Sequence, residues 1–151
     1  MTIELINTGA ELMLGRVLNS HQQWLCRQFA DRGYRVTRQT AVDDASPTID
    51  QVLRESLSRA DLVVTTGGLG PTSDDRTRDQ VAALLGRRLI QHEETLRRIV
   101  ERFAQRKRVM PERVKIQALV PEGALVLPND HGTAPGLAMR VEPGRFRAGD
   151  G

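Results

Sequence analysis

Cysteine, aromatic residues and long hydrophobic runs are scarce in this chain of 151 residues. Cys26 is the only cysteine, which excludes an internal disulfide and a cysteine-rich zinc site and favours a reducing, cytoplasmic setting. Aromatic residues make up 3% of the composition, so we do not expect a nucleic-acid partner bound by base stacking. No segment approaches the roughly 20 apolar residues of a membrane span, and no secretory signal is visible, so no membrane partner is expected.

The remaining composition is that of an ordinary globular domain. Hydrophobic residues make up 39% and charged residues 27% of the chain, and the mean hydropathy is −0.38. Lys and Arg number 22 against 19 Asp and Glu, a small excess whose placement matters more than its size. We expect one domain over residues 1–142 and a loop-like tail over residues 143–151.

Segments typical of strands and helices alternate over the first 85 residues. Strands are predicted at 3–6, 34–38 and 62–66, and helices after Asn19–Ser20, at Ser46–Pro47 and at Thr77. Farther along the chain we predict an edge strand at 89–90, a charged helix over 93–107, a short helix over 111–119, and strands at 125–127 and 137–141. The alternation implies an α/β fold with a mainly parallel sheet and helices on both faces, in which ligands bind beyond the carboxyl ends of the strands.

Apolar residues at helical spacing predict which helix faces are buried. In chain order these faces are Leu18, Leu25 and Phe29; Ile49, Val52, Leu53, Ser56, Leu57 and Ala60; and Leu96, Ile99, Val100 and Phe103. Asn19 or Ser20 is expected to cap the first of these helices. Thr77 and Gln80 have the spacing of a capping box.

Polar turns follow three of the predicted strands, at Thr8–Glu11, Val42–Asp44 and Thr65–Asp75. The carboxyl ends of parallel strands meet at one edge of a sheet, so we expect these turns to gather there. The glycines of the third turn let backbone N–H groups approach an anion, and the following helix start adds a favourable dipole. These features predict a phosphate or diphosphate site, although a glycine cluster alone is also typical of a plain tight turn. The glycine spacings of the P-loop and of the Rossmann fingerprint are both absent.

Four carboxylates, those of Glu11, Asp44, Asp74 and Asp75, are expected at the same edge. Their charge beside a phosphate has to be neutralised, and bound Mg²⁺ does this because it takes oxygen ligands and bridges substrate phosphates. The sequence therefore predicts a divalent metal, with Mg²⁺ the first choice. The alternatives are a helix cap for Asp74 or Asp75 and a surface turn for Asp43–Asp44.

Other polar segments have plainer interpretations. The loop Asn129–Gly136 is typical of a hairpin connection, and His21 and His92 are expected on solvated helix surfaces. His131 is a weak candidate metal ligand because no second histidine is placed to join it. The basic residues between 97 and 115 alternate with glutamates, as on a solvated helix face with Glu–Arg pairs, and we favour that interpretation over an anion-binding surface.

A set of longer motifs runs in unbroken order from Glu4 to Val141. The motifs are Thr8-Gly9-x-Glu11-Leu12-x-Leu14-Gly15, then Asp44, then Thr66-Gly67-Gly68-Leu69-Gly70-Pro71-Thr72-x-Asp74-Asp75-x-Thr77-Arg78, then Met110-Pro111-Glu112, then Gln117-Ala118-Leu119-Val120-Pro121-Glu122-Gly123-Ala124, and then Leu127-Pro128-Asn129-x-x-Gly132-Thr133-Ala134-Pro135-Gly136. Together they resemble the amino-terminal domain of the competence/damage-inducible CinA family. This resemblance implies the three-layer α/β/α, molybdopterin-binding-like fold of the wider MoaB/Mog superfamily.

The resemblance also implies an activity, since CinA-type domains are associated with metal-dependent hydrolysis of ADP-ribose at its pyrophosphate. By position, Asp44 and Asp75 match the acidic residues near the metal and the reacting phosphate, and Glu11 matches the acid of the first turn. The implied catalytic residues are thus Asp44 and Asp75, and the implied metal ligands are Glu11, Asp44 and Asp75. The implied phosphate- and nucleotide-binding residues are Thr8, Gly9, Thr66, Gly67, Gly68, Gly70 and Thr72, with Asn129, Gly132, Thr133 and Pro135 on the far side of the cleft.

The chain departs from the family pattern at several places. Ala10 stands where a polar residue is usual, and Asn19-Ser20-His21 replaces the usual Asp-Thr-Asn. A proline-rich loop expected after Val141 and the carboxyl-terminal deamidase domain are missing, so we expect a fragment of a longer protein.

Two other functions stay open. The first is a module that binds a pterin or nucleotide without turning it over. The second is a molybdopterin adenylyltransferase, disfavoured because Leu69 and Asp74 replace the Thr and Arg usual in those relatives. A homo-oligomer, a dimer or trimer, is expected by analogy with the superfamily.

Overall fold

The computed structural model describes residues 1–146, apart from the side chain of Ser46. The chain divides into two compact units, one formed by Met1–Gly68 with the residues from Glu142 onward, and the other by Leu69–Val141. The domain expected over residues 1–142 takes in parts of both units, and its boundary stays a prediction. Of the expected loop-like tail, Pro143–Phe146 forms turns, and residues 147–151 lie outside the described part of the chain.

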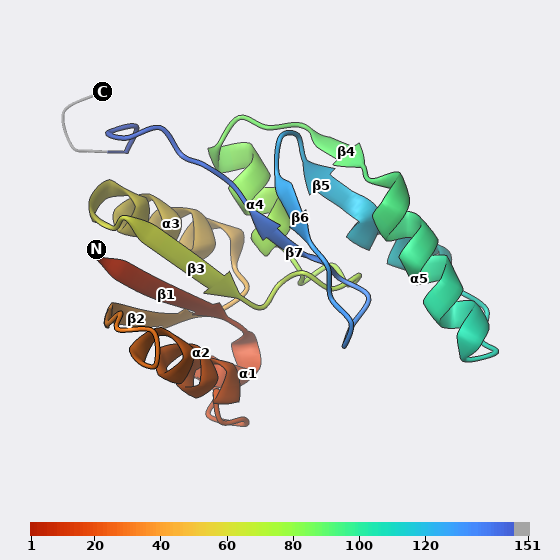
Figure 1. Cartoon of the computed structure of the whole chain (residues 1–151), viewed down its shortest axis with the longest axis horizontal. Helices are drawn as coiled ribbons and strands as arrows, with labels where there is room; N and C mark the ends of the chain where they lie inside the picture. Colours follow the sequence, from red (N-terminus) through yellow and green to blue (C-terminus); the bar gives the residue numbers. More distant parts are fainter. Residues whose placement is uncertain (147–151) are drawn as a thin grey trace. The chain divides into compact units, whose positions relative to one another are not determined.

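The first unit is built on a three-stranded parallel sheet (Figure 1). Its strands are β1 (Ile3–Thr8), β2 (Val36–Val42) and β3 (Leu62–Thr66), in the order β2-β1-β3. Every residue of the central strand β1 is buried, as expected for a strand covered on both faces. The predicted α/β class and parallel sheet are confirmed. The second strand begins later than predicted, since Tyr34 precedes β2 and is 48% exposed.

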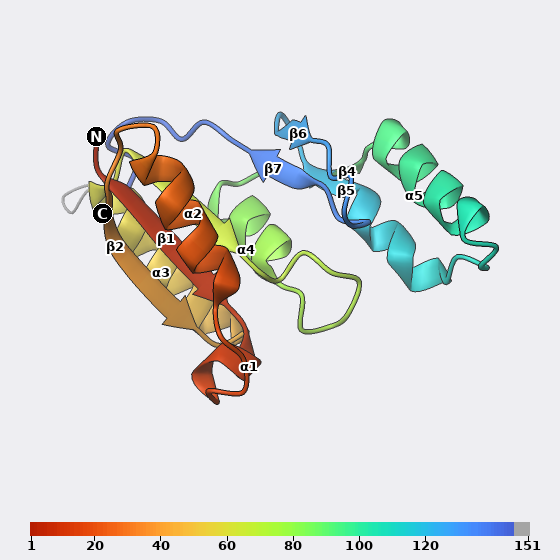
Figure 2. The same ribbon diagram turned by 60° about the horizontal axis from the view of Figure 1, so that its bottom comes forward.

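Helices α2 (Ser20–Ala30) and α3 (Ser46–Arg59) cover opposite faces of this sheet (Figure 2). Successive side chains of a strand point to opposite faces. Asn7 of β1 contacts Gln22 of α2, whereas Glu4 contacts Ser56 and Arg59 of α3. The unit is therefore a three-layer α/β/α arrangement. A one-turn helix, α1 (Ala10–Met13), follows β1 directly.

The helix ends show where the local predictions were right. Asn19 caps α2, because its Oδ1 accepts from the backbone N–H of Gln22 at 3.0 Å. Pro47 lies in the first turn of α3, as predicted, but the cap position is Ala45 rather than Ser46. Leu18 was assigned to the buried face of α2 and is 95% exposed, because it precedes the helix and does not share its periodicity.

The second unit contains two short pairs of antiparallel strands, two α-helices and a 3₁₀ helix. Its elements are α4 (Thr77–Leu84), β4 (Leu89–Gln91), α5 (Glu93–Gln105), the 3₁₀ helix η1 (Glu112–Ala118), β5 (Leu119–Pro121), β6 (Leu125–Leu127) and β7 (Gly136–Ala138). Strand β4 pairs with β5, and β6 pairs with β7. The last strand is shorter than the predicted 137–141, because β6 offers only three residues for pairing.

The core of this unit forms between α5 and η1. Ile99, Val114 and Ala118 are buried there, with Leu96, Phe103 and Met110 packed around them. Val100 was predicted on the buried side of α5, but it is 46% exposed because the helix turns this position away from η1. Within residues 1–146, none of the helices is both long and apolar enough to cross a membrane.

Candidate functional site

The three parallel strands of the first unit end level with one another. Thr8 is paired with Val42 and Asn7 with Thr66. The backbone N–H of Gly9 donates to the carbonyl of Val42 at 3.0 Å, which holds the first turn against the end of β2. The turns after β1, β2 and β3 therefore share one edge of this sheet, as the order of elements predicted.

Gly67 brings the end of β3 into contact with the end of β1. Its φ is +94°, a left-handed conformation that favours glycine. A Cβ at this position would lie 2.6 Å from Thr8 Oγ1 and would overlap the Thr8 carbonyl oxygen. The Thr8 hydroxyl also donates to the Thr66 carbonyl at 3.3 Å. Gly67 thus lets the backbone after β3 approach Thr8 closely, which a plain turn does not require.

Two of the predicted acidic residues lie against the same short segment, Gly9–Ala10. Asp44 Oδ2 accepts from the backbone N–H of Ala10 at 2.9 Å. The carboxylate of Glu11 lies over Gly9, where a Cβ would come within 2.6 Å of Oε1. The first-turn acid and the acid after β2 are therefore neighbours, and Asp44 does more than form a surface turn.

Glu11 and Asp44 could hold Mg²⁺ only if other groups supplied the rest of its ligands. Among residues 1–146, no three His, Cys, Asp or Glu side chains are grouped so that they could hold a metal ion. Mg²⁺, however, is commonly held by one or two carboxylates while phosphates and water supply its other ligands. Glu11 and Asp44 suit that arrangement, and the assignment of the metal to them stays a prediction.

Asp75 belongs to the second unit, where it shapes the loop Gly70–Asp75. Its Oδ2 accepts from the backbone N–H of Thr72 at 2.9 Å and from the Thr72 hydroxyl at 2.5 Å. Burial opposes ionisation of Asp75, but hydrogen bonds from Thr72 and Gly70 and the charge of Arg78 outweigh it and lower its pKa. The carboxylate lies so close to Gly70 that a Cβ there would be 2.7 Å from Asp75 Cγ.

The helix-cap alternative for the two aspartates is wrong. Helix α4 begins at Thr77 with Arg76, not an aspartate, in the cap position. Asp75 bonds instead to residues before it in the chain, which closes the loop. Asp74 is exposed and accepts from the neighbouring Ser73 hydroxyl at 3.4 Å.

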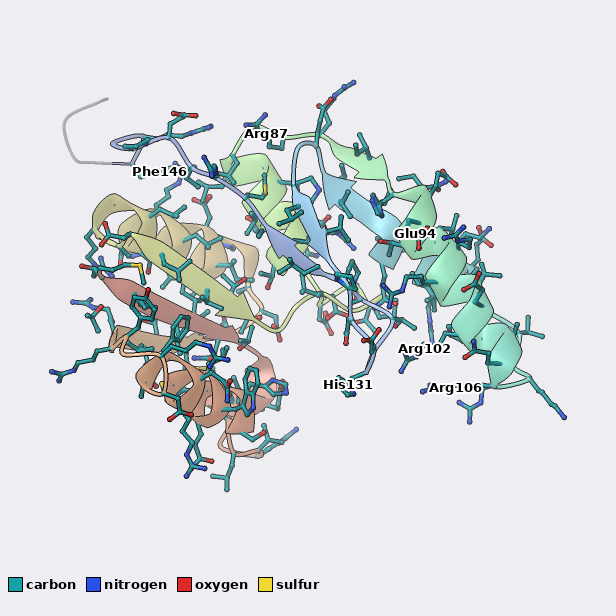
Figure 3. The ribbon with its side chains drawn as sticks, viewed as in Figure 1. Arg87, Glu94, Arg102, Arg106, His131 and Phe146 are labelled. Atoms are coloured by element: carbon teal, nitrogen blue, oxygen red, sulfur yellow. The ribbon has the colours of Figure 1, made fainter. Side chains whose placement is uncertain are left out.

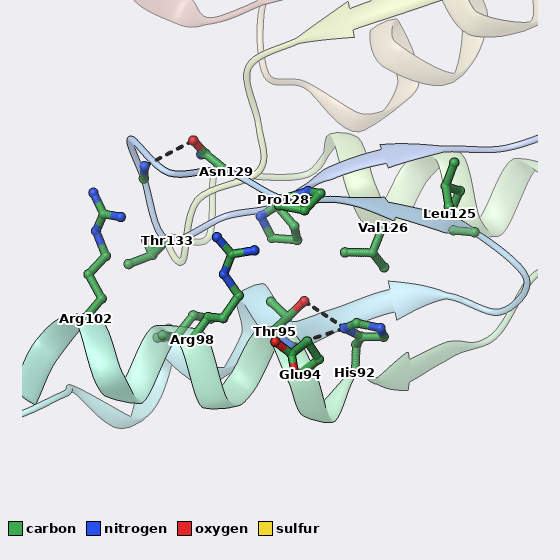
Figure 4. Close-up of a pocket in the computed structure, with 14 residues that line it drawn as sticks. His92, Glu94, Thr95, Arg98, Arg102, Leu125, Val126, Pro128, Asn129 and Thr133 are labelled. Atoms are coloured by element: carbon green, nitrogen blue, oxygen red, sulfur yellow. Dashed lines mark hydrogen bonds between the residues drawn. The ribbon is translucent and has the colours of Figure 1, made fainter.

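A pocket of about 370 Å³ lies in the second unit, between α5 and the β6–β7 hairpin (Figure 4). It is lined by His92, Glu94, Thr95, Arg98, Ile99, Arg102, Ala124, Leu125, Val126, Pro128, Asn129, Gly132, Thr133 and Pro135. Four of these residues, Asn129, Gly132, Thr133 and Pro135, were predicted to line a ligand cleft. All of the lining residues belong to Leu69–Val141.

The contribution of α5 to this pocket was missed by the sequence analysis. His92 is not on a solvated helix face: its Nδ1 accepts from the backbone N–H of Thr95 at 3.2 Å and caps α5. Arg98 and Arg102 line the pocket, although they were assigned to a solvated face. The spacing of His92, Thr95, Ile99 and Arg102 is that of one helix stripe and could have revealed the shared face.

Asn129 fixes the shape of the loop that closes the pocket. Its Oδ1 accepts from the backbone N–H groups of His131 and Gly132, at 3.0 and 3.2 Å. Its Nδ2 donates to the carbonyl of Ala134 at 2.8 Å. A Cβ on Gly132 would lie 2.8 Å from that Nδ2, so the glycine makes room for the Asn129 side chain. The loop is thus more ordered than a plain hairpin connection.

The predicted site residues therefore fall into three groups. The first unit holds Thr8, Gly9, Glu11, Asp44, Thr66, Gly67 and Gly68. The loop Gly70–Asp75 of the second unit holds Gly70, Thr72 and Asp75. The pocket of the second unit is lined by Asn129, Gly132, Thr133 and Pro135.

Comparison with known proteins agrees with this architecture. The family model described as a probable molybdopterin binding domain matches residues 4–145. A protein of Geobacillus kaustophilus named competence-damage inducible is 47% identical over 139 residues, which are 92% of this chain and 34% of that protein. A CinA-like protein of Anaeromyxobacter sp. is 45% identical over 139 residues, again 92% of this chain and 34% of the relative. The chain thus spans about a third of the length of these curated relatives.

Solved structures show the same fold. The crystal structure of CinA from Thermoplasma acidophilum has a TM-score of 0.81 and is 32% identical, covering 90% of this chain and 79% of that one. The molybdopterin biosynthesis enzyme MoaB from Thermus thermophilus has a TM-score of 0.54 at 22% identity, covering 80% of this chain and 78% of that one, and shows the fold alone. On these matches, the chain belongs to the CinA family and carries its molybdopterin-binding-like domain.

Proposed function

We propose that the domain binds ADP-ribose at the carboxyl ends of β1 and β3 and hydrolyses its pyrophosphate with the help of Mg²⁺. The observation that carries the proposal is the junction at which Gly67 packs on Thr8 beside the carboxylates of Glu11 and Asp44. Backbone N–H groups there suit phosphate oxygens, and the carboxylates of Glu11 and Asp44 would suit a divalent cation. The resemblance to CinA-type domains supports the choice of substrate.

Each residue of the site has a separate role in binding or hydrolysis. The backbone N–H groups of Gly67 and Gly68 would donate to the diphosphate. Thr8, Gly9 and Thr66 would line the site, since the Gly9 N–H and the Thr8 hydroxyl already donate to the carbonyls of Val42 and Thr66. Glu11 and Asp44 would hold the metal, or Asp44 would take a proton from the attacking water. When bound, Mg²⁺ would neutralise negative charge on the diphosphate. Water adds to one phosphorus as the bridging P–O bond breaks, and AMP and ribose 5-phosphate leave.

Asp75 has a different part in this proposal. Its carboxylate holds the Thr72 backbone N–H and hydroxyl in place, so it shapes the loop that directly follows Gly67 and Gly68 in the chain. We assign Asp75 a positioning role, because it holds the loop Gly70–Asp75 in shape. Asp75→Asn should therefore abolish hydrolysis while the fold survives.

The test measures release of AMP from ADP-ribose with and without Mg²⁺. Asp44→Asn and Glu11→Gln should remove the Mg²⁺-dependent turnover, with unchanged circular dichroism. Asp43→Asn is the matched control, because that exposed carboxylate accepts from the backbone N–H of Ala45, within its own turn. Turnover equal to wild type in Asp44→Asn and Glu11→Gln would contradict the proposal.

Isothermal titration with ADP-ribose separates catalysis from binding. Tight binding without any AMP release would make the domain a binding module. Absence of both binding and turnover would remove ADP-ribose as the ligand.

A further inference from the structure

Asn7 is a polar residue that is fully buried in the central strand β1. It comes directly before Thr8, near the carboxyl end of the strand, and it is paired with Thr66 of β3. Burying an amide costs free energy unless its N–H groups and its oxygen are hydrogen-bonded. The Asn7 side chain therefore has to find its partners among the elements around β1.

Both the amide nitrogen and the oxygen of the Asn7 side chain have such partners. Nδ2 donates to Gln22 Oε1 of α2 at 3.4 Å and to the Thr40 carbonyl of β2 at 3.5 Å. Oδ1 accepts from the Thr66 hydroxyl at 2.9 Å, the shortest of the three bonds. Asn7 thus joins both neighbouring strands to α2, in the space between α2 and the sheet that side chains fill in Figure 3.

Two backbone groups fix the direction of this hydrogen-bond network. The backbone N–H of Gln22 can only donate, so the Asn19 atom that receives it at 3.0 Å is the oxygen, and Asn19 Nδ2 is left as a donor. Asn19 Nδ2 donates to Gln22 Oε1 at 3.2 Å, which makes that Gln22 atom an acceptor. The Thr40 carbonyl can only accept. Turning the Asn7 amide around would therefore place its oxygen against two acceptors, Gln22 Oε1 and the Thr40 carbonyl.

The direction of the network decides what the Thr66 hydroxyl can offer to a ligand. Because Asn7 presents its oxygen, the single hydroxyl proton of Thr66 points to Asn7. The Thr66 oxygen keeps its lone pairs and can only accept from a further group. Thr66 is partly exposed at the end of β3, and Gly67 follows it directly. Two successive residues thus offer groups of opposite kind, a hydroxyl acceptor and a backbone N–H donor.

We propose that Asn7 is a positioning residue that fixes the Thr66 hydroxyl as an acceptor, so that Thr66 takes a ribose hydroxyl of the ligand and not a phosphate oxygen. The inference rests on the proposed function, because it takes ADP-ribose as the ligand and places the diphosphate on Gly67 and Gly68. A phosphate oxygen is itself an acceptor and is repelled by the lone pairs of Thr66. The riboses on either side of the diphosphate carry the nearest hydroxyl donors.

The test compares ADP-ribose with inorganic pyrophosphate, which has a diphosphate but no ribose. In the presence of Mg²⁺, release of AMP gives the KM for ADP-ribose and the inhibition constant of pyrophosphate. Thr66→Val exchanges the hydroxyl for a methyl group and should raise the KM about fivefold, since one hydrogen bond is lost, without changing the inhibition constant. Thr66→Ser restores a hydroxyl and should recover most of the affinity for ADP-ribose.

Asn7→Leu tests the positioning role itself. Without the Asn7 oxygen, the Thr66 proton is free to turn toward the ligand and donate to a phosphate oxygen. Pyrophosphate should then bind about threefold more tightly, a gain that damage to the fold would not produce. The gain should vanish in the double variant with Thr66→Val, because no hydroxyl remains. Circular dichroism checks that each variant is folded.

Thr65→Val is the matched control, since it removes the same group from the neighbouring residue of β3, whose side chain points to the opposite face of the sheet. It should change neither constant. A wild-type KM in Thr66→Val would overturn the proposal. An equal loss for pyrophosphate would also overturn it, because the hydroxyl would then serve phosphate or Mg²⁺. Absence of ADP-ribose turnover by the wild type is a different failure, which removes the proposed function and this inference with it.

Discussion

Glu4 is the one acidic residue buried in the central strand, and its neutralisation should destabilise the first unit. Only 2% of Glu4 is exposed, and its carboxylate accepts from Ser56 Oγ at 2.8 Å and from Arg59 Nε at 2.7 Å. Removing one partner of a fully buried pair costs about 3–5 kcal/mol. The Arg59 side chain, however, is 35% exposed and is screened by water. We therefore expect Glu4→Gln to lower the free energy of unfolding by about 1–2 kcal/mol.

The pH dependence of this loss has a definite sign. Burial of Glu4 opposes ionisation, but hydrogen bonds from Arg59 and Ser56 and the charges of Arg59 and Arg38 lower its pKa below the ordinary 4.5. The folded state thus holds the charged form more firmly than the unfolded chain does. The stabilisation is fully present above pH 4.5 and is lost as the pH falls through the lower folded pKa. Wild type and Glu4→Gln should differ at pH 7 and converge in acid.

Urea unfolding followed by fluorescence measures this difference. Trp24 is the only tryptophan and lies in α2, so its emission reports on the first unit. Glu122→Gln is the control, because the Arg88–Glu122 pair is exposed and its loss should move the urea midpoint little. The reasoning fails if Glu4→Gln is as stable as wild type at pH 7, or if the difference stays the same at pH 3.

Four other substitutions test the local geometry, with Gly15→Ala serving as the control for Gly67→Ala. Gly67→Ala should destabilise the first unit by more than about 1–2 kcal/mol, the cost of the left-handed conformation alone, because its Cβ also overlaps Thr8. Gly15→Ala, with φ +65° but open space around it, should cost less in the same urea titration. Asn19→Ala removes the cap of α2 and should cost about 0.5–2 kcal/mol; an unchanged urea midpoint would show that the cap contributes nothing. Asn129→Ala should free the amides of the pocket loop, so their hydrogen exchange should accelerate while that of α5 does not; equal rates would mean that the loop is held otherwise.

Local sequence signals were sufficient for the elements of the first unit. The apolar run at Leu62–Thr66, the cap at Asn19 and the proline at position 47 each act within a few residues, so their structural result can be read along the chain. Leu18 and Tyr34 were misplaced because an element's exact start decides whether a residue follows its periodicity.

The candidate sites needed more than sequence. Order of elements alone predicted that Gly9, Asp44 and Gly67 would meet at one sheet edge, because parallel strands end together. It could not show that Asp75 turns back onto Thr72 instead of capping α4, since two neighbouring hydrogen bonds decide that choice.

The sequence by itself determined the α/β class, the parallel sheet and the family, since these follow from periodicity and from motifs that are continuous in the chain. Only the tertiary structure decided that Arg98 and Arg102 face the Asn129 loop rather than water. The apolar residues of α5 predicted its buried face, but the sequence does not show which of its charged residues lie beside a neighbouring element. That depends on the element that packs against the helix. Here this element is the β6–β7 hairpin, about 30 residues farther along the chain, so local sequence patterns do not reveal the contact.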